Sequence, residues 1–262
     1  MIKAAARFGR KKSTRLFKDF YLEWIETLKT NLLPLLRRSI LVSSSNQLST
    51  HVQMIQHHFQ NYYLTLDLAA SEDVSQILFP IWRNSLEKPF LWVGDFHPNL
   101  FTNLLRSFLN NNNSSDEEID DTHIEKSSNF PLVWKYPSKN LMNKIEQIEC
   151  GLRSMVPTLV TRYRKSQSKF LDKCGLNWIN CESKQEILKT VEKDLMVEIE
   201  ELVGVFLDAN RLRRSVLTEI IGATDIYQAA LYLEGLAQFF VGFSDGELLH
   251  EFEQCKIPLS GI

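Results

Sequence analysis

The chain has 262 residues, enough for one large domain or two small ones with a sizeable core. Its formal net charge of −2 gives no overall attraction to nucleic acid. The 10 glycines are fewer than a Rossmann fold or a β-sandwich usually needs for its turns, so the composition favours helices. No apolar run approaches the roughly 20 residues of a membrane span, and the N-terminus lacks the apolar stretch of a secretory signal.

The cysteines indicate free thiols in a reducing compartment. Cys150, Cys174, Cys181 and Cys255 form no C-x-x-C pair, and their spacing matches no zinc site. We therefore expect no structural metal and no disulfide framework.

The first 16 residues form a basic arm. Residues 1–18 contain no acid and seven basic residues, which are Lys3, Arg7, Arg10, Lys11, Lys12, Arg15 and Lys18. Such an arm is attracted to anionic lipid, and these seven residues are our candidates for a membrane contact. A nuclear signal, a transit peptide and a solvated tail remain alternative interpretations.

Helical periodicity begins at Phe17, and it predicts a first helix that Pro34 kinks or ends, followed by a loop over 42–50. The second predicted helix has its apolar face at Leu48, Val52, Ile55, Phe59, Tyr62, Tyr63 and Leu66. A short helix at 72–79 follows, and then an irregular aromatic stretch at 80–98 that contains no convincing strand.

Pro98 suits the first turn of the next predicted helix. Residues 110–129 hold six acids, one lysine and almost nothing apolar, which predicts a disordered insert. The remaining predicted elements are helices at 138–173, 184–207, 209–221 and 224–240, a break at 174–183 and a C-terminal tail at 241–262. Pro157 is expected to kink the first of these helices, and Thr224 to cap the last, with Asp225 in its first turn. The predicted fold class is an all-α bundle of about seven to nine helices.

The stretch from Trp82 to Pro98 is the most specific pattern in the chain. We interpret its large aromatic residues as anchors where helices meet, and Gly94 as the residue that lets the chain turn. The alternative is a partner or ligand pocket that the same residues line. The candidates for this site are Trp82, Phe90, Trp92, Gly94, Phe96 and His97.

Two other patterns have simple interpretations. Residues 242–246 match the G-x-S-x-G spacing of a nucleophile elbow, but the residues before them are predicted to be helical and only His250 follows. We therefore interpret the motif as a helix C-terminal turn. The histidines form no H-x-x-x-H pair, although His51 and His58 can share one face of a helix.

The segment 57–105 resembles the core of the DOG1-domain family, which occurs in seed-dormancy proteins and in the C-terminal part of TGA-type bZIP factors. The residues that carry the resemblance are Asp73, Val74, Trp82, Glu87, Phe90, Leu91, Trp92, Gly94, Phe96 and Pro98. Phe20 and Trp24 match the opening helix of the family, and the likeness extends over about 17–240. Asp95 replaces the second glycine of the family pattern, and His97 replaces its usual arginine.

The amino-acid sequences of the stretches at 17–39 and 90–109 are most similar to the inaperturate-pollen branch of this family. That resemblance implies a non-enzymatic plant adaptor that marks plasma-membrane domains where pollen apertures form. The implied partners are another DOG1-domain protein and the anionic plasma-membrane surface, with homo- or hetero-oligomers and a cytoplasmic, peripheral location. No heptad zipper precedes the domain, so we expect no direct DNA binding. The alternatives are a sensor of haem or lipid, with no cofactor otherwise expected, and a nuclear co-regulator of bZIP factors.

Overall fold

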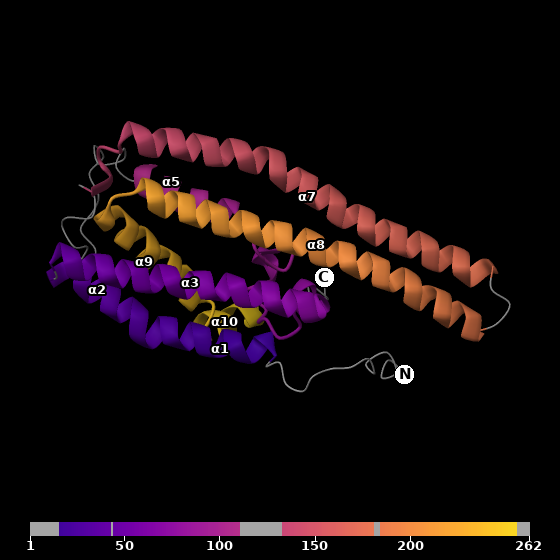
Figure 1. The fold of residues 1–262 in the computed structure, drawn as a ribbon. Coiled ribbons are helices and arrows are strands. Elements are labelled where there is room, and N and C mark those ends of the chain that lie inside the picture. Colours follow the sequence, from indigo (N-terminus) through magenta and orange to yellow (C-terminus); the bar gives the residue numbers. More distant parts are fainter. Residues whose placement is uncertain (1–15, 43, 111–132, 181–183, 256–262) are drawn as a thin grey trace, which may run out of the picture.

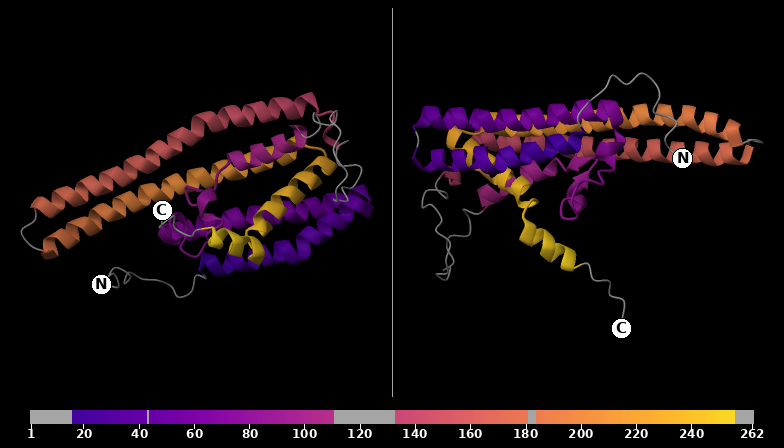
Figure 2. Two further views of the ribbon diagram at one scale, coloured as in Figure 1. Left: turned by 180° about the vertical axis from the view of Figure 1, so that it is seen from behind. Right: turned by 90° about the horizontal axis from the view of Figure 1, so that it is seen from below.

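The computed structural model describes residues 16–42, 44–110, 133–180 and 184–255. The described chain is an all-α bundle, as predicted, built around long helices that lie side by side (Figure 1). The long elements are α1 (Phe17–Thr27), α2 (Leu33–Val42), α3 (Ser45–Asp73), α7 (Lys139–Asn180), α8 (Lys184–Ala223) and α9 (Ile226–Gly242). Helices α7 and α8 extend past the ends of α1 and α3 as a two-helix arm (Figure 2). In the described part, no helix is both long and apolar enough to cross a bilayer.

Helices α1 and α2 are joined by a π-helical turn at Leu28–Leu32. Pro34 lies just after this turn, where its ring would collide with the carbonyl of Thr30 in a regular α-helix. The wider turn, in which the Leu33 amide donates to the Leu28 carbonyl, accommodates the ring without ending the helix. Pro34 therefore does not end the helical run, which continues through the π-helical turn to Val42.

Helix α3 contains the most regular apolar stripe of the protein. Every residue predicted for its apolar face is buried, from Leu48 to Leu66. The predicted loop over 42–50 is wrong, because α2 reaches Val42 and α3 already begins at Ser45. Polar composition suggested a loop there, but those side chains occupy the exposed first turns of α3.

The aromatic stretch contains two short strands that the sequence did not predict. After the short helix α4 (Ser75–Leu78) and a 3-10 turn at Lys88–Phe90, strand β1 (Leu91–Trp92) pairs antiparallel with β2 (Asp95–Phe96). Strands of two residues leave no alternating pattern to recognise. Helix α5 (Asn99–Asn110) follows, and it buries Phe101 and Leu105.

The two longest helices run without the predicted interruptions. Helix α7 continues to Asn180, so the break predicted at 174–183 is wrong up to that residue. Helix α8 has no break near 208 and continues to Ala223. Pro157 lies inside α7, which therefore lacks one backbone donor there. Most of the insert predicted at 110–129 lies outside the described residues.

Helix α9 begins with a capping box that differs from the prediction. Asp225, and not Thr224, is the N-cap, because its carboxylate accepts from the amides of Tyr227 and Gln228. The Gln228 side chain in turn accepts from the Asp225 amide, at 3.2 Å. The G-x-S-x-G motif is the turn that ends α9 and precedes α10 (Gly246–Gln254), which confirms its interpretation as a helix terminus.

Candidate functional site

The hairpin of β1 and β2 turns through two residues with positive φ, Val93 at 43° and Gly94 at 81°. Positive φ at both central positions is the geometry of a tight two-residue hairpin, and it is strained for a β-branched residue such as valine. A Cβ on Gly94 would lie 2.9 Å from Cγ2 of Ile77. Glycine is therefore required here for both its conformation and its size.

Arg213 of helix α8 holds this strained turn by its backbone. Its Nε donates to the Phe96 carbonyl at 2.7 Å, and its Nη2 donates to the carbonyls of Val93 and Asp95 at 3.1 and 3.2 Å. The same nitrogen also donates to the Trp92 carbonyl. The guanidinium is fully buried, and this burial lowers the pKa of Arg213. Charge-assisted bonds from one guanidinium to four carbonyls fix the backbone of the turn.

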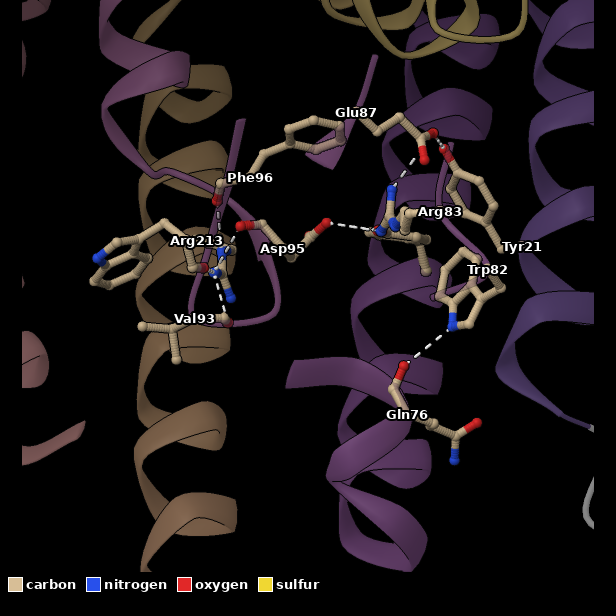
Figure 3. A network of polar contacts seen from close by, with 11 residues as sticks. Tyr21, Gln76, Trp82, Arg83, Glu87, Val93, Asp95, Phe96 and Arg213 are labelled. Carbon is tan, nitrogen blue, oxygen red and sulfur yellow. Dashed lines mark hydrogen bonds and ion pairs between the residues drawn. The ribbon is translucent and has the colours of Figure 1, made fainter. Parts of the chain in front are cut away.

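Asp95 connects this clamp to a second buried arginine, Arg83. Figure 3 shows Asp95 between the two guanidinium groups, with its main chain towards Arg213 and its carboxylate towards Arg83. Oδ1 of Asp95 accepts from Nη2 of Arg83 at 3.0 Å and from the Tyr62 hydroxyl at 2.8 Å. The two side chains of this ion pair are fully buried, at 0% exposure each. We call the group Tyr21, Tyr62, Arg83, Glu87, Asp95 and Arg213 the buried polar centre.

Glu87 and Tyr21 complete the buried polar centre on the side of α1. The Tyr21 hydroxyl donates to Oε1 of Glu87 at 2.5 Å, and the same oxygen lies 3.7 Å from Nη1 of Arg83. Burial raises the pKa of the Tyr21 and Tyr62 hydroxyls above their ordinary value, so both phenols stay protonated and act as donors. The centre thus contains two buried arginines and two buried carboxylates, so its formal charges balance.

Aromatic rings enclose Arg83 and shield it from water. Its guanidinium carbon lies 4.4 Å from the ring centre of Tyr21, 4.9 Å from that of Trp82 and 5.5 Å from that of Phe96. Such stacking favours the cation where desolvation opposes it. The centre therefore joins α1, α3, the segment 80–98 and α8 through buried hydrogen bonds and an ion pair, and this arrangement is suited to bracing helices.

The aromatic candidates differ in their burial. Phe96 lies in the core, and Trp82 is half-buried, with its Nε1 donating to the Gln76 carbonyl at 3.0 Å. Trp92 is half-buried beside His97, with ring centres 5.0 Å apart. Phe90 is 49% exposed, and its ring lies beside those of Phe239 and Phe243. Phe90 is therefore a partial anchor, since half of its surface reaches solvent.

His97 and Gly94 have separate positions on either side of β2. Gly94 forms the turn, as predicted, whereas Nδ1 of His97 accepts from the Asn99 amide at 3.1 Å at the start of α5. Burial, together with the positive charge of Arg213, lowers the pKa of His97. His97 also lines a pocket of about 430 Å³ between α5 and α7, which it shares with Thr102, Glu149 and other residues. The other aromatic candidates do not line that pocket.

The histidines of α3 serve packing. The His58 ring stacks on Trp24, with centres 4.9 Å apart, and its Nε2 bonds to the Trp24 carbonyl at 3.0 Å. His51 bonds to the Ser39 hydroxyl through Nδ1. The described residues contain no group of three or more His, Cys, Asp or Glu side chains placed to hold a metal. Of the membrane-contact candidates, Lys18 is exposed at the start of α1, and the other six lie outside the described residues.

Sequence reasoning missed most of the buried polar centre. Glu87 was named as one element of a motif, Tyr62 as part of an apolar helix face, and Asp95 as a departure from a pattern. A usable signal was Arg213, which interrupts the apolar stripe formed by Phe206, Ala209, Val216 and Ile220. A charged residue at a buried position of a helix face indicates a buried partner.

The family model DOG1, described as seed dormancy control, matches residues 32–107. The chain is 45% identical to Protein INAPERTURATE POLLEN1 of Arabidopsis thaliana, over 96% of this chain and 98% of that protein. It is 35% identical to the INAPERTURATE POLLEN 1 homolog of rice, Oryza sativa subsp. japonica, over 95% of this chain and 93% of that protein.

A more distant match is rice Transcription factor TGA2.1, at 29% identity over 34% of this chain and 27% of that factor. The helical fold and the match to the DOG1 family model define the class, which is a helical protein of the DOG1 type. The full-length matches are more specific, and the chain belongs to the INAPERTURATE POLLEN1 family of DOG1-domain proteins.

Proposed function

We propose that the chain is a non-enzymatic regulatory adaptor in pollen aperture formation, which marks domains of the plasma membrane by binding anionic lipid and a second DOG1-domain protein. The observation that carries the proposal is the 45% identity to INAPERTURATE POLLEN1 across nearly the whole of both chains. At this level the similarity includes the parts outside the region 32–107 that the DOG1 model matches.

The charge distribution supports peripheral membrane attachment. The first 18 residues carry seven positive charges while the whole chain has a net charge of −2, so the rest of the chain carries −9. An anionic leaflet attracts the arm, by about 1 kcal/mol for each well-placed basic residue, and repels the acidic body. The arm has few large apolar residues, and stable attachment therefore requires a second contact, which a protein partner can supply.

The buried polar centre supports a scaffolding role. Its charges are directed inward and fix the segment 80–98 to α1, α3 and α8. The paired helices α7 and α8 are thereby anchored at one end on a braced body and extend away from it (Figure 1). A rigid helical arm on a braced body is suited to presenting a surface to another protein.

Sedimentation with lipid vesicles tests the membrane contact. We expect the full chain to bind phosphatidylserine-containing vesicles in a salt-sensitive manner and to bind neutral vesicles weakly. Reversing Arg10, Lys11, Lys12 and Arg15 to Glu should abolish the binding and leave the helical circular dichroism unchanged. A matched control reverses four exposed basic residues of the body, which are Lys29, Arg38, Lys139 and Arg153. Equal binding by the arm variant and the wild type would show that the arm is not the lipid contact.

Localisation of the tagged protein in developing microspores tests the biological role. The proposal expects patches at the plasma membrane and loss of these patches in the arm variant. Accumulation in the nucleus alone would contradict the proposal and favour the alternative of a co-regulator of bZIP factors.

A further inference from the structure

Two large apolar side chains project into solvent at the turn that follows α4. Phe79 is 59% exposed and Ile81 is 90% exposed, whereas Pro80 between them is buried. Leu16, the residue directly before α1, is 63% exposed. We call Leu16, Phe79 and Ile81 the apolar tip. Exposed apolar groups of this kind typically mark a contact with a protein or with a membrane.

The residues of the apolar tip lie at one end of the body. The Phe17 amide donates to Oε1 of Gln76 at 3.3 Å, and the ring centres of Phe17 and Trp82 are 5.7 Å apart. Leu16 therefore precedes a residue that contacts both flanks of the 79–81 turn. Figure 1 shows the start of α1 and the end of α3 at the same end of the body, with the end of α2 at the opposite end.

Hydrogen bonds hold the turn in place. The Ile81 amide donates to the Phe79 carbonyl at 2.9 Å, and the Arg83 amide donates to the Pro80 carbonyl at 3.2 Å. Arg83 also belongs to the buried polar centre, which fixes the chain two residues after Ile81 (Figure 3). The turn is thus preorganised, and little conformational entropy is lost when its apolar side chains leave water.

The size and the place of the apolar tip favour a lipid occupant. A standard protein interface buries about 800 Å² of each partner, which is more than three side chains can supply. A few apolar side chains suffice to enter the boundary between headgroups and acyl chains of a leaflet. Residues 1–15, with six basic residues and no acid, join the described chain at Leu16, so the basic arm starts beside the tip.

The tip and the basic arm supply different parts of a membrane contact. Asp19 in the first turn of α1 and Glu72 near the end of α3 are exposed, and both oppose the approach of an anionic leaflet. The basic arm supplies the attraction but has few large apolar residues. The tip supplies apolar surface without positive charge, so each part needs the other.

We propose that the apolar tip inserts into the acyl boundary of an anionic leaflet and is the second contact that the basic arm needs for stable attachment. The inference rests on the proposed membrane contact of the basic arm and adds to it a site on the folded body. The role of a protein partner is then to select the membrane domain, because the chain holds itself on lipid.

Vesicle sedimentation of the full chain with Phe79→Ser and Ile81→Ser tests the insertion. Both side chains are exposed, so this tip variant should keep wild-type helicity in circular dichroism. Its dissociation constant for phosphatidylserine-containing vesicles should rise at least about tenfold, since two large apolar side chains no longer leave water on binding. The matched control carries Leu41→Ser and Val42→Ser, which alter comparably exposed side chains at the opposite end of the body, and it should bind like the wild type.

Quenching by lipid locates the tip directly. The variant Ile81→Trp places an indole at the most exposed position of the tip and retains the five tryptophans of the wild type. Phosphatidylserine-containing vesicles with brominated acyl chains should quench the fluorescence of this variant by a larger fraction than that of the wild type. The control variant Val42→Trp should show no such excess.

The outcomes separate this inference from the proposed function. Equal vesicle binding by the wild type and the tip variant, or no excess quenching of Ile81→Trp, would overturn the insertion and leave the contact of the basic arm standing. That result is expected if a protein partner or residues 256–262 cover the tip instead. Failure of the wild type to bind anionic vesicles at all would overturn both proposals.

Discussion

Replacing Asp95 by Ala is the sharpest test of the buried polar centre. The carboxylate is 0% exposed, and the substitution removes two hydrogen bonds, one from Arg83 and one from Tyr62. Arg83 would keep its hydrogen bond to the Tyr62 hydroxyl at 2.7 Å, but its nearest carboxylate would be that of Glu87 at 3.7 Å, so its charge would lose its closest partner. The hairpin itself should survive, since Arg213 holds it through main-chain carbonyls.

The expected cost is large because a buried charge loses its partner. Removing one member of a buried ion pair typically costs about 3–5 kcal/mol, whereas a surface substitution usually changes stability by less than about 0.5 kcal/mol. We therefore expect Asp95→Ala to lower the free energy of unfolding by about 4 kcal/mol, or the melting temperature by about 8 °C for a chain of this size. Replacing the exposed Asp172 by Ala serves as the control.

Urea unfolding followed by circular dichroism at the helical band measures this cost. The double variant Arg83→Met with Asp95→Ala removes both charges, so its loss should be smaller than the sum of the two single losses by about 1–3 kcal/mol. A cost below about 1 kcal/mol for Asp95→Ala, or strictly additive effects, would refute the reasoning that the pair is a coupled buried unit.

Further predictions concern residues around the same segment. Trp92→Ala should lower the free energy of unfolding by about 3 kcal/mol, the low end for a large aromatic because the ring is half-buried, and this is measurable by urea titration. Gly94→Ala should cost at least about 1–3 kcal/mol in the same assay, because alanine is strained at a φ of 81° and meets Ile77. Asp225→Ala should cost about 1 kcal/mol through loss of the cap of α9, and Asp225→Asn should restore most of it. The pKa of His97 is lower in the folded chain than its ordinary value of 6.5, so the unfolded chain binds a proton at this residue more readily than the folded chain does. The melting temperature should therefore fall as the pH drops from 7 through the folded pKa. The fall should be smaller in His97→Asn.

Hydrophobic periodicity identified the helices that bury a single face in the apolar core. The stripe of α3 from Leu48 to Leu66 was correct at every position, because one face of that helix meets a continuous apolar core. Boundaries were less certain. Ser45 to Thr50 resembled a loop and Thr224 resembled a cap, since polar composition and capping propensity are local preferences that a neighbouring residue can satisfy equally well.

The candidate site was likewise predictable from the sequence only in part. The segment from Trp82 to Pro98 was recognisable as special, and Gly94 was predicted to form the turn that it does form. Its charged partners were not predictable, because Arg213 lies 118 positions from Asp95 and Tyr62 lies 33 positions from it. Contacts between residues so far apart in the chain leave no local spacing, and only a polar residue on an apolar helix face gives a hint of them.

The helical class, the apolar faces and the positive charge of residues 1–18 can be read from the sequence, because they depend on residue type and on spacing within one element. Only the folded chain shows that Asp95 lies between two buried arginines, Arg83 and Arg213. The physical reason is that burial and charge pairing are properties of surfaces brought together by folding, and the same aspartate or lysine in an isolated helix would be a solvated surface group.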